Sequence, residues 1–166
     1  MSTTTHDGFA GFAERDRAHV LTATDWGLFF IRLALGVVFF AHGAQKVLGW
    51  FGGPGLSATV GGMAHMGIPA ALGYIAAFTE FLGGLGLIFG VLARLSALGI
   101  FIEMIVAVLK VHLANGFFMN WMGNQKGEGY EYHLLVFAMT LMVMLAGPGR
   151  IALTDIEARI GRKTGQ

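Results

Sequence analysis

Four long apolar segments, separated by polar ones, are the main pattern of this sequence. They cover residues 26–48, 69–93, 95–113 and 132–147. A helix needs about 20 residues to cross the apolar part of a bilayer, and the first three segments reach or approach that length. None of the four alternates between apolar and polar residues, as a transmembrane strand would. The pattern therefore predicts an all-α protein, a bundle of four transmembrane helices in which the fourth is the shortest.

The connection between the first two segments predicts a helix that does not cross the membrane. It begins with GWFGGPG, in which glycines on both sides of Pro54 require a turn. Leu56, Val60 and Met63 then recur at helical spacing, with no charged residue among them. Residues 49–68 are too few for a turn and a full span. We therefore expect a short interfacial helix between helices one and two.

Polar segments flank the membrane domain, which spans residues 26–148. Residues 1–25 contain STTT and ERDR, and they predict a cytoplasmic tail, because the first apolar segment comes too late and is too long for a secretory signal. In residues 149–166, Thr154 and Glu157 have the spacing of a capping box. This predicts a short amphipathic helix in a second cytoplasmic tail.

Lysine and arginine are unevenly shared between the two sides of such a bundle. Seven fall in the tails and in the hinge between helices two and three, and three fall on the opposite side. The seven are Arg15, Arg17, Arg94, Arg150, Arg159, Arg162 and Lys163, and the three are Lys46, Lys110 and Lys126. Cytoplasmic segments carry the excess of these residues. Both termini are therefore predicted to be cytoplasmic, and the protein is expected in the cell (inner) membrane.

Composition narrows the class of protein further. Charged residues make up 13% of the chain, against about 25% in soluble domains, which suits a protein surrounded by lipid. The net charge of +1 gives no reason to expect a nucleic-acid partner. The chain has no cysteine, and it has no phosphate loop, dinucleotide fingerprint or HExxH motif. The sequence thus shows no bound cofactor and predicts no metal site.

Ionisable side chains inside the apolar segments are the first candidates for function, because burying them in a membrane is costly. At about 100° per residue, Arg32 and Lys46 share one face of the first helix with Gly36 and Gly43, and small residues also surround Glu80. Small residues mark the faces on which membrane helices pack. These charges are therefore predicted to face the interior of the bundle.

Their depths predict two layers of polar groups. In the deeper layer, Arg32 pairs with one of two glutamates, while the other glutamate is protonated or faces Lys110 or water. Above it, on the outer side, a polar pocket forms. The predicted catalytic residues are Glu80, His42, Lys46 and His133, and the predicted buried charge network is Arg32, Glu80, Glu103 and Lys110.

Each of these residues also has a purely structural interpretation. Arg32 and a glutamate would then only fix the register of two helices, and Lys46 and Lys110 would extend to the outer headgroups. On a helical wheel, His112 lies about 180° from Glu103, which suits the membrane interface at least as well as a ligand role. The sequence leaves these alternatives open.

Four segments, in their order and spacing, match the pattern of one known family. They are RLALGVVFFAHGAQKVLGWFGGPG at 32–55, FTEFLGGLGLIFGVLARL at 78–95, EYHLLVFAM at 131–139 and GPGRIALTD at 147–155. Together they resemble the DoxX family of small bacterial and archaeal membrane proteins. One departure is Ala152, which stands where the family commonly has serine.

The resemblance implies a four-helix bundle and a link to membrane redox systems, since relatives include a membrane subunit of a thiosulfate:quinone oxidoreductase. The first hypothesis is therefore an integral membrane subunit of a quinone-linked oxidoreductase, with quinone as a substrate. The second is a non-catalytic membrane anchor or assembly partner of a soluble oxidoreductase. The third is a small-solute or proton transporter, which with four helices would need to form a homo-oligomer.

Overall fold

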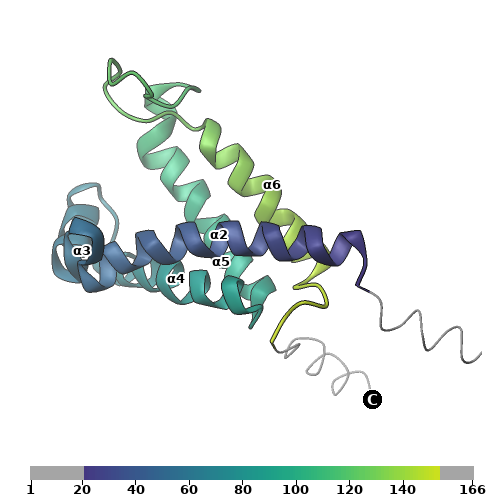
Figure 1. The fold of residues 1–166 in the computed structure, drawn as a ribbon. Helices are drawn as coiled ribbons and strands as arrows, with labels where there is room; N and C mark the ends of the chain where they lie inside the picture. The colour runs from purple at the N-terminus through teal and green to yellow at the C-terminus, as the bar shows by residue number, and fades with distance from the viewer. Residues whose placement is uncertain (1–20, 154–166) are drawn as a thin grey trace, which may run out of the picture.

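The computed structural model describes residues 21–153 of the 166-residue chain, and in this part every regular element is helical (Figure 1). The longer helices are α2 (Ala23–Leu48), α3 (Gly55–His65), α4 (Ala70–Phe89), α5 (Ala93–Ala107) and α6 (Glu131–Ala146). Three short turns complete the set: the 3₁₀ turns η1 (Trp50–Gly52) and η3 (Leu113–Asn115), and the π-helical turn η2 (Val108–His112). The helix predicted after Thr154 lies outside the described residues.

Three helical stretches are long and apolar enough to cross a membrane. They are α2, α4 and the continuous stretch Ala93–Asn115, which runs from α5 through η3. The apolar helix α6 has 16 residues, fewer than the about 20 that a span perpendicular to the membrane needs. The helical membrane bundle is confirmed, and α3 confirms the short helix expected between the first two spans. The count of four spans stays a prediction.

A capping box starts α2 three residues before the apolar segment that predicted it. Thr22 Oγ1 accepts a hydrogen bond from the backbone N–H of Asp25 at 3.2 Å, and the Asp25 carboxylate accepts one from Thr22 N–H at 2.9 Å. The helix ends at Gly49, whose φ of 71° is left-handed. Glycine takes this conformation without the steric cost that a side chain would add.

Glycines bring α2 and α4 into close contact. A Cβ atom added at Gly43 would overlap with the backbone of Phe81, and one added at Gly84 would overlap with the backbone of Phe40. One added at Gly36 would lie 2.8 Å from the carbonyl oxygen of Gly84. Small residues let membrane helices approach until their backbones touch. These three glycines therefore fix the register in which α4 runs back along α2.

The helices α4 and α5 form a tight hairpin that opens along its length. The chain turns at Gly90, where φ is 73°. Close to the turn, a Cβ atom added at Gly86 would lie 2.5 Å from the hydroxyl of Ser96. Further on, one added at Gly99 would lie 2.9 Å from the side chain of Thr79. Beyond this point α5 runs away from α4, toward the loop that leads to α6 (Figure 1).

The core lies where two helix pairs join, a first arm made of α2 and α4 and a second arm made of α5 and α6. Its buried apolar residues are Leu35, Phe39, Leu87, Ala93, Ala97, Ile100, Met104, Val136 and Val143. Figure 1 shows that the two arms join toward the end of the molecule at which the described chain begins and ends. At the other end the two arms diverge, and α3 packs against the first arm (Figure 1).

Candidate functional site

An ion cluster lies inside the bundle, where the two arms separate. The ammonium group of Lys46 on α2 forms an ion pair with the carboxylate of Glu80 on α4, and its Nζ lies 4.0 Å from Oε1 of Glu103 on α5. Glu80 is 3% exposed, and the side chains of Glu103 and Lys46 are 12% and 25% exposed. One cation thus faces two carboxylates from different helices, largely shielded from solvent.

Two glycines place the partners of Glu80. Gly43 lies one helical turn before Lys46 and touches the backbone at Glu80 and Phe81. Gly99 lies one turn before Glu103 and touches Thr79, the residue next to Glu80. Because side chains a turn apart share a face of a helix, both contacts direct the charged side chains toward Glu80. The cluster is therefore a product of close helix packing at small residues.

The cluster has the groups to bind and release a proton. With both carboxylates ionised, one ammonium would face two negative charges, and a net charge in an apolar interior is costly. A proton bound to either carboxylate would restore neutrality. Within the described residues, Oε2 of Glu103 is buried and has no hydrogen-bond partner. A buried polar atom of this kind is expected to meet water or a ligand.

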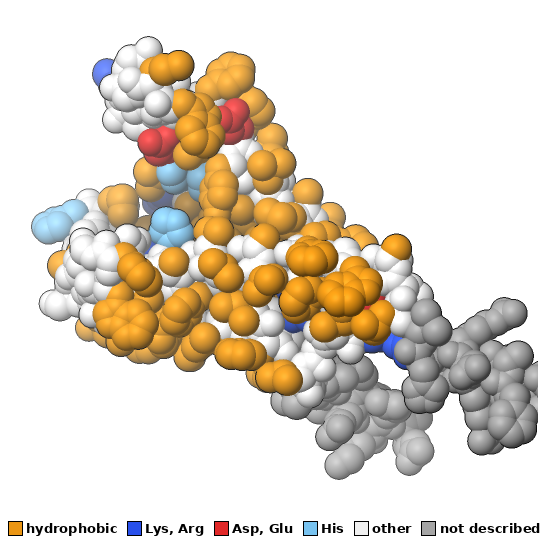
Figure 2. Space-filling model, in the orientation of Figure 1, with side chains coloured by type: hydrophobic (Ala, Val, Ile, Leu, Met, Phe, Trp, Pro, Cys, Tyr) orange, Lys and Arg blue, Asp and Glu red, His pale blue; other side chains and the backbone are white. Residues whose placement is uncertain are grey.

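A cavity of about 730 Å³ lies between the two arms, beside the cluster. Its ionisable residues are His42, Lys46, Glu80, Glu103, Lys110, His112, Glu128, Tyr132 and His133. Its other walls are mainly apolar side chains of α3, α4 and α5, among them Met63, Leu72, Ile75 and Ile102. Figure 2 shows the space between the arms from one side, with histidine side chains on its walls. The cavity thus has ionisable groups at one end and mainly apolar side chains along its other walls.

The four residues predicted to be catalytic line this one cavity. Lys46 and Glu80 form the ion pair, His133 is buried in α6, and His42 is exposed at the edge of the cavity on α2. The structure therefore brings them together, as the prediction of a polar pocket required. Their chemical roles stay a prediction.

A pair of histidines forms the wall on the side of the second arm. The rings of His112 and His133 lie 4.3 Å apart, centre to centre. Nδ1 of His112 lies 2.8 Å from the backbone oxygen of Glu128. Nδ1 of His133 is buried and has no hydrogen-bond partner among the described residues. A second residue that lines this cavity therefore carries an unpartnered polar atom.

The helical wheel misplaced His112. It put this residue opposite Glu103, yet both line the cavity. The reason is the π-helical turn η2, which contains His112. A π turn rotates each residue by less than the 100° of an α-helix, so His112 lags behind its ideal position and swings back toward Glu103. Nothing in the local sequence marks this turn.

Lys110 is not part of the buried charge network, contrary to the prediction. It lines the cavity, but it is exposed and forms no ion pair within residues 21–153. Lys46, and not the more deeply placed Arg32, is the cation that pairs with the glutamates. The interpretation in which Lys110 extends toward the surface fits its exposure.

Arg32 does not pair with either glutamate, so that prediction was wrong. Its Nη1 donates to the backbone oxygen of Leu87 at 2.6 Å, and its Nη2 donates to the backbone oxygen of Ile151. The residue is 0% exposed. The reason lies in the register of the helices, because α4 runs antiparallel to α2. An early residue of α2 therefore lies beside the end of α4, and Glu80 lies beside the second half of α2.

Arg32 instead closes the end of the molecule where the described chain begins and ends. The last carbonyl groups of a helix lack partners within it, and a cation beside them is favoured by the helix dipole. Arg32 meets both conditions at the end of α4. The segment after α6 is also held there, since Arg150 N–H donates to Asp25 at 3.1 Å and Leu153 N–H donates to Phe89 at 2.9 Å.

Sequence reasoning missed Tyr132. It is half-buried and lines the cavity beside His133. Its phenol is a donor and an acceptor of hydrogen bonds. The available signal was its position next to His133 at the start of an apolar segment, where a tyrosine is equally typical of the membrane interface.

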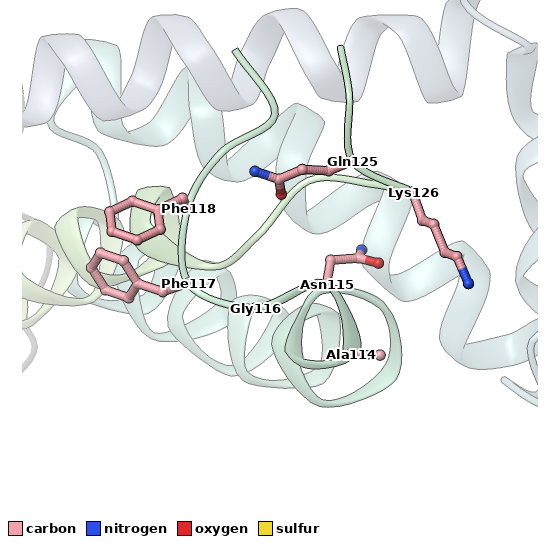
Figure 3. Close-up of a pocket in the computed structure, with 7 residues that line it drawn as sticks. All are labelled: Ala114, Asn115, Gly116, Phe117, Phe118, Gln125 and Lys126. Atoms are coloured by element: carbon pink, nitrogen blue, oxygen red, sulfur yellow. The ribbon is translucent and has the colours of Figure 1, made fainter. Parts of the chain in front are cut away.

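A second hollow lies in the loop after η3 (Figure 3), and it is a weaker candidate. It is open and has a volume of about 330 Å³. Its lining residues are Ala114, Asn115, Gly116, Phe117, Phe118, Gln125 and Lys126. Lys126 is exposed, and in Figure 3 its side chain extends away from the two phenyl rings. No buried charge faces this hollow, so we do not assign it a function.

The helical bundle with a buried ion cluster at a largely apolar cavity defines a small polytopic membrane protein with a ligand-sized internal site. The family model described as DoxX matches residues 27–113, more than half of the chain, and the protein belongs to the DoxX family. The matched residues include all three members of the ion cluster and end before His133. No solved structure matches the chain.

One relative from Bacillus subtilis (strain 168) carries the name "Putative oxidoreductase CatD". It is 27% identical to this chain over 139 residues, which cover 84% of this chain and 92% of the relative. The similarity therefore extends over most of both chains.

Proposed function

We propose that this DoxX-family protein is a quinone-binding membrane subunit of an oxidoreductase system in the cell (inner) membrane. The observation that carries the proposal is the cavity, because it combines mainly apolar walls with the buried cluster of Lys46, Glu80 and Glu103. A quinone has the same two parts, a polar ring and an apolar tail. The name of the Bacillus subtilis relative supports the oxidoreductase part of the proposal.

The chemistry of quinones suits these residues. Reduction of a quinone to a quinol takes two electrons and two protons, and oxidation releases them. Glu80 and Glu103 supply or accept protons, and Lys46 holds them in place and offsets their charge. His133 Nδ1, which is unpartnered, provides a hydrogen bond to a ring oxygen. The electrons come from a partner oxidoreductase, since the sequence contains no motif for a redox cofactor.

The size and the closed inner end of the cavity also favour a binding site over a pore. Ligand pockets usually measure about 300–1,000 Å³, and this one measures about 730 Å³. Its lining reaches Phe39 and Met104, and beyond them Leu35, Leu87 and Ile100 are fully or almost fully buried. A solute path through the whole bundle would have to cross this packed core.

Ligand binding to the purified protein in lipid nanodiscs tests the proposal. We expect a labelled quinone to bind at a saturable site and to be displaced by unlabelled quinone. Lys46→Met should weaken binding about tenfold or more, because the two carboxylates lose their shared cation near the ring. Lys126→Met is the matched control and should bind like the unaltered protein, because Lys126 lines only the open loop hollow. Absence of saturable binding would refute the proposal.

A further inference from the structure

We infer that the ligand enters and leaves the cavity sideways, from the surrounding lipid, through an opening between α4 and α5. The lateral opening is defined by Leu72 and Ile75 on α4 and by Ile102 and Val106 on α5. The inference rests on the proposed function for the identity of the ligand, a membrane-dissolved quinone with an apolar tail. The route itself is inferred from the geometry of α4 and α5.

The opening begins where the α4–α5 hairpin stops packing. Between the turn at Gly90 and the contact of Thr79 with Gly99, small residues hold the two helices together. Thr79 and Gly99 also line the cavity. So do Leu72 and Ile75, which precede Thr79 on α4, and Ile102 and Val106, which follow Gly99 on α5. The ion cluster therefore lies just past the last tight contact, at the inner end of a gap that widens away from it.

The residues of the opening face both ways. Leu72 is 52% exposed, Ile75 60%, Ile102 53% and Val106 40%, and all four line the cavity. A side chain that lines a cavity and is also about half exposed marks a place where the cavity meets the outer surface. Here that surface belongs to two of the helices that are long and apolar enough to cross a membrane. The cavity therefore opens toward lipid.

The side chains at its edge distinguish the lateral opening from other places where the cavity reaches the surface. On the first arm, the cavity also reaches the surface at Val38 and His42, which are both exposed. That edge carries an imidazole, and the exposed Lys110 lines the cavity four residues after Val106, whereas the four residues that define the lateral opening are all aliphatic. An apolar tail is better accommodated along the aliphatic edge, since lipid and tail have the same polarity. The ring then lies toward Glu80 and Glu103.

Bulky substitutions at the opening test the route in the full-length protein. Ile75→Trp and Ile102→Trp should slow the exchange of a labelled long-tailed quinone from nanodisc-bound protein by roughly tenfold, because the larger side chains narrow the opening. The exchange of a quinone without a tail should change little. The matched controls are Leu82→Trp on α4 and Leu98→Trp on α5, which are also exposed but do not line the cavity.

The outcomes separate the route from the proposed function. If no quinone binds saturably to any variant or to the unaltered protein, the proposed function fails and the route fails with it. If quinone binds but Ile75→Trp and Ile102→Trp exchange it as fast as their controls, the lateral route alone is wrong. If Val38→Trp slows exchange instead, the ligand passes between the first arm and α6, which also overturns the route.

Discussion

The two ends of the bundle treat a buried cation in opposite ways. Arg32 and Lys46 both lie on α2, yet Arg32 donates to backbone oxygens and is fully buried, whereas Lys46 meets two carboxylates beside a cavity. Backbone carbonyls cannot titrate, so the two hydrogen-bond partners of Arg32 cannot change their charge. Carboxylates can bind protons, so the charge at the open end can change. Arg32 therefore holds helix ends together, whereas the cluster around Lys46 contains groups that can bind and release protons.

The largest expected effect is on stability, at the closed end. Arg32→Met should lower the free energy of unfolding by about 3 kcal/mol or more, because each buried acceptor left without a donor costs about 1–3 kcal/mol. Thermal unfolding of the purified protein in detergent measures the change, with Lys126→Met as the control. A variant that unfolds at the same temperature as the control would contradict the role given to Arg32.

The next largest effect is expected at Gly43, where α2 and α4 are in close contact. Gly43→Ala should destabilise the protein by about 1–3 kcal/mol, because its Cβ would overlap with the backbone at Phe81 and force α2 away from α4. It should also weaken quinone binding, since Lys46 moves with the helix. Gly27→Ala is a control on the same helix, because no atom lies within 4 Å of its added Cβ. Equal stability of the two variants would show that α2 and α4 do not need this close contact.

A smaller effect is expected at His133, which we propose binds the quinone ring through a hydrogen bond and does not take part in proton exchange. His133→Leu should weaken quinone binding roughly two- to tenfold, the worth of one hydrogen bond, and His133→Asn should recover part of the loss because its amide lies near the position of Nδ1. Equilibrium binding in nanodiscs gives both values. If both variants bind as well as the unaltered protein, His133 does not hold the ring.

The last prediction leaves stability unchanged and assigns the two ends to sides of the membrane. The chain has no cysteine, so single cysteines can report on sidedness. We expect Lys126→Cys to react with an impermeant maleimide in spheroplasts, and Gln166→Cys to react only after the membrane is opened. The charge bias of the loops is the reason. The reverse labelling pattern would place the closed end outside.

Much of the fold followed from the sequence because it depends on local patterns. The apolar segments predicted the main helices, and the glycine–proline turn predicted α3. The predicted link between Lys46 and small residues on its face agrees with the structure, since Gly43 lies one turn before Lys46 and contacts the backbone at Glu80. These inferences need only the periodicity of a helix and the sizes of its side chains.

The pairing inside the site depended on features beyond a single helix. The prediction paired Arg32 with a glutamate because it used only the depth of Arg32 along α2. It did not take into account that α4 runs antiparallel to α2. That error was avoidable, since late residues of α4 must lie beside early residues of α2. The position of His112 was not predictable in the same way, because the local sequence carries no signal for the π turn of η2.

The most direct test of the central claim is infrared difference spectroscopy of the protein in lipid, with and without bound quinone. If the cluster of Lys46, Glu80 and Glu103 binds the ring and exchanges protons with it, quinone should change a carboxyl C=O band. That change should be altered or lost in Glu80→Gln and Glu103→Gln. It should remain in Glu131→Gln, because Glu131 does not line the cavity. Its carboxylate accepts hydrogen bonds from the backbone N–H of Met119 and the indole N–H of Trp121 in the loop. A carboxyl band that quinone leaves unchanged, or that survives both substitutions, would contradict the account.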